Sequence, residues 1–195
     1  MSAAVEASTR STAPESGVTR PVRLVRVAVL LIVGMAIAFS APMHEQLSFN
    51  LGLVAAGLGG IGVAHLVEWF SLRGGARTPV PLLLGVVALG AALALPFTTA
   101  PIGFALVVAA WALISGLLEF IGAAVRPGTR QDATLLGSTG VLLALLVLFV
   151  REDQVAIIGF FGAYALLVGV FLGISAFDTR RSSAPAAADA APVAP

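Results

Sequence analysis

Apolar residues along this chain are gathered into six long runs that short polar connections separate. The runs are Val27–Met43, Phe49–Phe70, Val80–Phe97, Ile102–Val125, Ala133–Val150 and Val155–Phe177. Each is close to the ~20 residues that a helix needs to cross ~30 Å of hydrocarbon. None has the apolar/polar alternation of a barrel strand, and in lipid a helix satisfies its own backbone hydrogen bonds. The pattern predicts an all-α, polytopic membrane protein with six transmembrane helices.

The two ends of the chain have a different composition, rich in Ser, Thr, Ala and Pro. No apolar segment directly follows Met1, so residues 1–22 do not have the pattern of a cleavable signal peptide. We expect residues 1–22 and 182–195 to be disordered tails, and residues 23–181 to form the membrane domain.

The composition narrows the classes of function. Hydrophobic residues make up 58% of the chain and charged residues 11%, whereas about a quarter of a soluble domain is charged. There is no cysteine, which excludes disulfides, thiol catalysis and Cys-bound metal. No phosphate-binding glycine loop, HExxH helix or Ser/His/Asp arrangement is present. We therefore expect a protein that is not an enzyme and has no catalytic, cofactor or metal site.

The basic residues, all eleven of them arginine, are distributed unevenly between the two sides of the membrane. Only Arg151 falls on the side opposite the termini. The other ten precede the first helix, lie in the second and fourth connections or follow the sixth helix: Arg10, Arg20, Arg23, Arg26, Arg73, Arg77, Arg126, Arg130, Arg180 and Arg181. By the positive-inside rule both termini are cytoplasmic. The use of arginine without lysine indicates a GC-rich bacterial genome, hence an inner membrane. The arginines suit anionic lipid headgroups and not nucleic acid.

The even-numbered helices align with one another without gaps. Gly62, Gly116 and Gly169 coincide in this alignment, and an arginine follows each at nearly the same distance. The odd-numbered helices carry Gly34, Gly90 or Gly140. The sequence thus predicts three parallel-repeated helical hairpins, related by an axis along the membrane normal.

Two of these segments resemble a known family. The pattern W-x-L-I-x-G-x-x-E at Trp111–Glu119 and the pattern G-x-Y-A-L-L-x-G-x-x-L at Gly162–Leu172 resemble the HdeD-like acid-resistance membrane proteins. The second helix departs from this pattern, since Gly57 stands where the others carry an aromatic residue. The resemblance, over Val27–Arg181, implies six helices, a bacterial inner membrane and a link to acid stress. It implies no catalytic residue.

Glu119 is a carboxylate inside an apolar run, roughly 9 Å from the expected cytoplasmic end of its helix. A charge at that depth costs ~2.5–3 kcal/mol, so the side chain should face protein or water. Trp111 and Ser115 share its face of the helix. One interpretation is a proton-accepting or ion-binding site. The other is an ion pair with an arginine from a helix end, either Arg73 or a snorkelling Arg126.

His65 occupies in the second helix the position that Glu119 has in the fourth. Glu68 is three residues further and shares its face. An imidazole–carboxylate pair near the membrane surface could titrate close to pH 6. The alternative is a satisfied polar pair at the interface, with Trp69 in the aromatic belt.

Small residues spaced by four form a stripe on the second helix, and a second stripe lies on the sixth. Such spacing allows helix backbones to approach closely. The stripes predict either packing within the chain or the interface of a homo-oligomer. The helix-packing candidates are Gly52, Ala56, Gly60, Gly62, Gly116, Gly169 and Gly173.

Two functions follow from these observations. The preferred one is a non-enzymatic inner-membrane protein of the HdeD-like type that contributes to acid or envelope stress resistance. The alternative is a small proton-linked transporter or channel that uses His65, Glu68 and Glu119 within the membrane.

Overall fold

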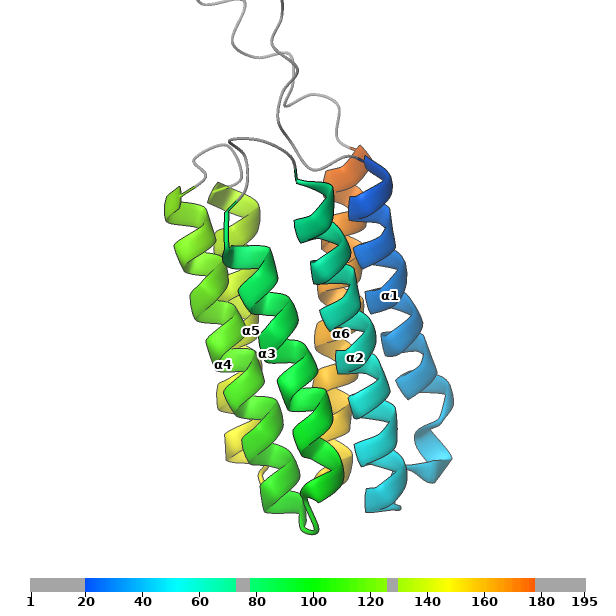
Figure 1. Ribbon diagram of the computed structural model, residues 1–195. Coiled ribbons are helices and arrows are strands. Elements are labelled where there is room, and N and C mark those ends of the chain that lie inside the picture. Colours follow the sequence, from blue (N-terminus) through cyan, green and yellow to red (C-terminus); the bar gives the residue numbers. More distant parts are fainter. Residues whose placement is uncertain (1–19, 73–77, 126–129, 178–195) are drawn as a thin grey trace, which may run out of the picture.

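The computed structural model describes residues 20–72, 78–125 and 130–177, which form six α-helices and two short 3-10 helices (Figure 1). Their bounds are α1 Arg20–Phe39, η2 Ala41–Met43, α2 Leu47–Ser71, α3 Val80–Ala94, η4 Leu95–Phe97, α4 Pro101–Val125, α5 Arg130–Phe149 and α6 Gln154–Phe177. Six helical segments, with α3 and η4 counted as one, are long and apolar enough to cross a membrane. The expected all-α architecture is confirmed, and it is that of a multi-pass membrane protein.

Prolines account for several helix ends. Pro101 is the first residue of α4 and Pro81 lies in the first turn of α3, where a missing N–H costs little. Pro42 and Pro96 lie in η2 and η4. The first apolar run, expected to stay helical to Met43, therefore leaves the α-helix after Phe39.

The start of α1 also differs from the expectation. The helix begins at Arg20, before the first apolar run, so that residues 20–22 are helical although they were expected in the N-terminal tail. The rest of both expected tails lies outside the described residues. Because the helix begins early, Arg23 and Arg26 are helical residues and not part of a connecting segment.

The six helices stand side by side and form a closed bundle, in which each packs against the next and α6 packs against α1 (Figure 1). The start of α1 and the end of α6 lie at the same end of the bundle, which we call the terminal end. The most extensive packing joins α2 to α3, α4 to α5 and α6 to α1.

Glycines lie at these three contacts. A Cβ on Gly62 would come within 3.1 Å of the Gly85 carbonyl oxygen, and one on Gly116 within 2.8 Å of the Gly137 oxygen. At Gly169 it would meet the Leu31 side chain at 3.0 Å. The close approach of these helices therefore requires the absence of a side chain.

The other small residues do not behave alike. A Cβ on Gly60 would meet Val29 at 3.2 Å and one on Gly173 would meet Val27 at 3.5 Å, whereas Gly52 has open space around it. Ala56 is exposed. The stripe on α2 thus packs within the chain over only part of its length.

The glycines of the odd-numbered helices are not equivalent. Gly34 lies against the Gly162 oxygen of α6 and Gly140 against the Ala112 oxygen of α4, but Gly90 faces open space. The sequence analysis noted a glycine in each odd-numbered helix, but only Gly34 and Gly140 are needed for close packing.

The core is densest in the half of the bundle remote from the terminal end. Its large apolar side chains come from the early turns of α2, α4 and α6 and from the ends of their neighbours. They include Val54, Leu58, Leu95, Phe104, Val108, Val147, Ile157, Ile158 and Phe161, each with no exposed surface. Buried polar residues lie in two places: His65 and Ser115 toward the terminal end, and His44 and Asn50 at the far end.

Candidate functional site

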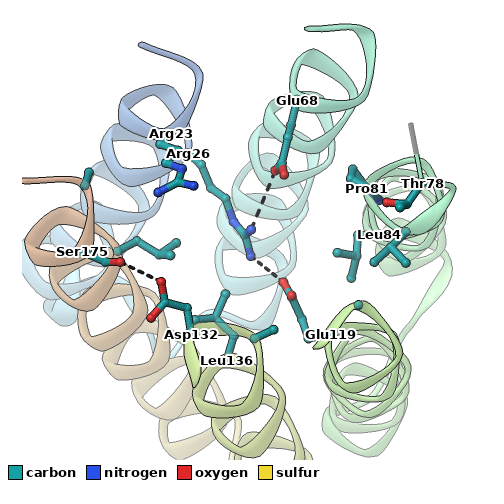
Figure 2. Close-up of a pocket in the computed structure, with 15 residues that line it drawn as sticks. Arg23, Arg26, Glu68, Thr78, Pro81, Leu84, Glu119, Asp132, Leu136 and Ser175 are labelled. Atoms are coloured by element: carbon teal, nitrogen blue, oxygen red, sulfur yellow. Dashed lines mark hydrogen bonds and ion pairs between the residues drawn. The ribbon is translucent and has the colours of Figure 1, made fainter. Parts of the chain in front are cut away.

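Three charged side chains meet in the bundle interior near the terminal end. Arg26 extends from α1 between Glu68 of α2 and Glu119 of α4 (Figure 2). Its Nη2 donates a hydrogen bond of 2.8 Å to Glu119 Oε1, and its Nη1 lies 3.8 Å from Glu68 Oε2. The side chains are 17%, 14% and 15% exposed in the order Arg26, Glu119, Glu68. Such low exposure strengthens a charge-assisted hydrogen bond.

The position of Arg26 follows from the helical repeat. Arg26, Leu30, Val33 and Ile37 are spaced by four, three and four residues and so lie on one face of α1. The three apolar members of this stripe are buried. Arg26 therefore faces the bundle interior as the last member of the core stripe toward the terminal end.

The partner of Glu119 is thus an arginine near the end of another helix, as one of the two interpretations predicted, but it is neither of the arginines named for it. Arg73 and Arg126 lie outside the described residues. Arg26 was missed because it was counted only as a charge that sets membrane orientation. Its spacing from the buried stripe of α1 was the signal that could have identified it.

His65 joins the same group. Its Nδ1 lies 3.9 Å from Glu68 Oε2, and its side chain is 6% exposed. This distance is within ion-pair range when the ring is protonated, but it is too long for a direct hydrogen bond. The three candidates of the sequence analysis, His65, Glu68 and Glu119, therefore all lie around Arg26. We call these four residues the charge network.

A cavity of about 120 Å³ lies beside the charge network. We call it the outer cavity. Its polar lining includes Arg23, Arg26, Glu68, Glu119 and Asp132, and its apolar walls include Leu84, Leu136 and Leu172. All six α-helices contribute residues to it. Ser175 of α6 donates a hydrogen bond of 2.7 Å to Asp132 of α5, which links these helices at the cavity wall (Figure 2).

A second cavity, of about 20 Å³, is also lined by Arg26 and Glu119. We call it the inner cavity. His65, Trp111, Ser115 and Tyr164 supply its other polar groups. The presence of Trp111, Ser115 and Glu119 in its lining agrees with the prediction that these residues share one face of α4. The Trp111 ring also packs edge-on against Tyr164 and Phe161, with ring centroids 5.7 and 5.6 Å apart.

The far end of the bundle carries a separate polar cluster that was not predicted. Asn50 has no exposed surface, and its Nδ2 donates a hydrogen bond of 2.6 Å to the His44 carbonyl oxygen. Gln154 at the start of α6 donates to the Glu45 carbonyl oxygen. Burial lowers the pKa of His44, whose Nε2 is 3.1 Å from Ser40 Oγ. The Gln154 bond fastens the connection between α1 and α2 to α6, and the Asn50 bond fastens it to the start of α2.

Within the described residues, no three His, Asp or Glu side chains are placed to hold a metal ion. Comparisons with protein families, with curated proteins and with solved structures find no match to this chain. The chemistry of the site must therefore be argued from its own residues. These residues can hold or exchange a proton and can hold helix ends together by charge.

Proposed function

We propose that this protein is a non-enzymatic, multi-pass protein of a bacterial inner membrane that contributes to acid or envelope stress resistance. The observation that supports this most is the convergence of His65, Glu68 and Glu119 on Arg26. Titratable groups are costly in the interior of a membrane protein and mark functional sites there. The two carboxylates hold the guanidinium, so a change in their charge would alter the network.

In this proposal the terminal end of the bundle faces the cytoplasm. The support is the placement of ten arginines in segments at or beyond that end of the helices, in keeping with the positive-inside rule. Those arginines other than Arg26, which is bound inside the bundle, would contact the headgroups of anionic lipids. The outer cavity would then be exposed to the pH of the cytoplasm.

The proposal includes a threefold repeat of helical hairpins of the HdeD-like type. It draws support from the three extensive helix contacts, α2 with α3, α4 with α5 and α6 with α1, which are the contacts between successive hairpins in a closed ring. Gly62, Gly116 and Gly169, which coincide in the sequence alignment, each lie at one of them. The family-like motifs at Trp111–Glu119 and Gly162–Leu172 support the same assignment.

The acid response would act through helix contacts. At neutral pH the carboxylate of Glu119 balances the Arg26 charge and joins α4 to α1. Loss of the negative charge on Glu119 would leave the guanidinium with less compensation and would weaken this link. An ion pair between elements that can move relative to one another is a known kind of switch.

Deletion of the chromosomal copy in the source bacterium tests the stress assignment. We expect survival at low external pH to fall and to be restored by the wild-type chain expressed in trans. Unchanged survival in the deletion strain, at low pH and under envelope stress, would contradict the proposal.

Proton-linked transport is the second candidate, favoured by the outer cavity that reaches the charge network from the terminal end. In this case the charge network would be open only toward the terminal end. The fully buried apolar side chains in the far half of the bundle would close the opposite side. Solute or proton flux in proteoliposomes discriminates the two functions. Equal flux for the wild type and Glu119→Gln would remove Glu119 from any transport mechanism.

A further inference from the structure

The inner cavity is lined by three buried polar atoms without a hydrogen-bond partner among the described residues. They are His65 Nδ1, Trp111 Nε1 and Ser115 Oγ. Their residues are 4%, 3% and 8% exposed. Buried polar atoms are almost always bonded to protein or to ordered water, since an unmet bond costs free energy. Three such atoms around one cavity therefore point to a bound polar group.

The size of the cavity identifies that group. A water molecule needs about 10–15 Å³ of accessible space and two to four polar partners. The inner cavity provides about 20 Å³ and the three unpartnered atoms. A solute larger than water would not fit without movement of the helices.

The hydrogen-bonding capacity of the three atoms also matches water. The Trp111 indole N–H can only donate, whereas a serine hydroxyl and the unprotonated nitrogen of a neutral imidazole can accept. Water can accept one hydrogen bond from Trp111 and donate two, to Ser115 and His65. All three unmet positions are then satisfied at once.

We propose that the inner cavity is a binding site for one water molecule, and that this water connects Glu119 to His65 for proton exchange. Arg26 and Glu119 line both cavities, so their ion pair borders the water site as well as the outer cavity. A proton that binds Glu119 from the outer cavity can pass to the water while the water gives one of its protons to His65. Two protons move: the Glu119 O–H and one water O–H break, a new water O–H and a His65 Nδ1–H form, and the net transfer is one proton.

Other charged and titratable groups facing this path come from most of the packed helices. Arg26 of α1, Glu68 of α2, Asp132 of α5 and Tyr164 of α6 line one cavity or both, while α3 contributes only apolar residues such as Leu84. Glu68 lies 3.9 Å from His65 Nδ1 and would stabilise the protonated ring. The proton step rests on the proposed function, but the water site does not.

The water site can be tested in the purified full-length chain, because the sequence has only two tryptophans. In a Trp69→Phe background Trp111 is the only indole, and its N–H to N–D exchange can be followed by ultraviolet resonance Raman spectroscopy after transfer to D2O. We expect Trp111 to exchange at least about tenfold faster than in the same chain with Ser115→Val. The valine removes a partner and fills the cavity with methyl groups.

Equal exchange rates in the two chains would overturn the water site. If Ser115→Val does not fold, an experimental density map of the wild type shows whether a water molecule occupies the inner cavity. A solvent peak within hydrogen-bond distance of Trp111 Nε1 and Ser115 Oγ supports the site, and a dry cavity contradicts it.

The proton link has its own readout. With His44→Gln, His65 is the only histidine, and its 15N resonances report which ring nitrogen is protonated. We expect Glu119→Gln to shift the pH midpoint of His65, and Glu152→Gln at the far end to leave it unchanged. An unshifted midpoint refutes the proton link whatever the outcome of survival assays, so failures of the two proposals can be told apart.

Discussion

Arg26 Nη2 lies 2.8 Å from Glu119 Oε1, although 93 positions of the chain separate these residues. The bond joins the first helix to the fourth across the interior of the bundle. Because Glu68 is also within 4 Å of the same guanidinium, three helices share one buried positive charge. Removal of that charge should therefore affect both stability and proton response.

Replacement of Arg26 by glutamine should strongly destabilise the protein. It leaves Glu68 and Glu119 close together without their shared cation, and loss of one partner of a buried ion pair costs roughly 3 kcal/mol. Thermal or denaturant unfolding in detergent measures the effect. Arg23→Gln is the control, because Arg23 is an exposed arginine on the same helix. Equal stability of the two variants would show that the pair contributes nothing. The double variant Arg26→Gln/Glu119→Gln should recover part of the loss.

Gly116→Ala should weaken the contact between α4 and α5. The added Cβ would come within 2.8 Å of the Gly137 carbonyl oxygen, a backbone atom that moves only with its helix, and overpacking of this kind costs ~1–3 kcal/mol. Gly52→Ala is the matched control, since open space surrounds Gly52 and alanine favours the helix by up to about 1 kcal/mol. The unfolding midpoint should fall for the first variant and hold or rise for the second. A shift of the unfolding midpoint in the same direction for both variants would contradict the described packing.

The orientation of the helices can be tested with single cysteines, because the natural chain has none. A membrane-impermeant thiol reagent added to spheroplasts should label Glu152→Cys, which lies in the connection between α5 and α6. It should label Ser182→Cys only after the membrane is permeabilised, since we place both termini in the cytoplasm. The reverse labelling pattern would invert the proposed topology and place the charge network on the outer side.

His44 should make the stability of the protein depend on pH. Burial lowers its pKa in the folded chain, so below the usual histidine value of 6.5 the unfolded chain binds the proton more readily. Stability is therefore greatest above that value and falls as the pH decreases through it. His44→Gln should reduce this slope in unfolding measurements made between about pH 7 and pH 5. An unchanged slope would assign the pH dependence to other groups.

The six helices could be predicted from the sequence because length and hydropathy alone decide whether a segment crosses a bilayer. The ends of the helices were predicted less accurately from the sequence. The apolar pattern did not reveal that α1 begins at Arg20, because its first seven residues include three arginines and hydropathy marks only the apolar part of a helix.

The members of the site were predicted better than their pairing. His65, Glu68 and Glu119 stood out as polar residues in apolar runs, and their spacing placed them toward one side of the membrane. That Arg26 lies between them depends on how α1 packs against α2 and α4, which no local pattern specifies. The same holds for Asn50, which is fully buried and which the sequence analysis did not single out.

The most direct test of the account is the survival of deletion cells at low external pH when they express Glu119→Gln from a plasmid. We expect survival to stay near that of the deletion strain, while Glu152→Gln, a change of the same chemistry outside the network, restores it to the wild-type level. Both proteins must be present in the membrane at equal amounts. Full restoration by Glu119→Gln would contradict the claim that the charge network carries the function.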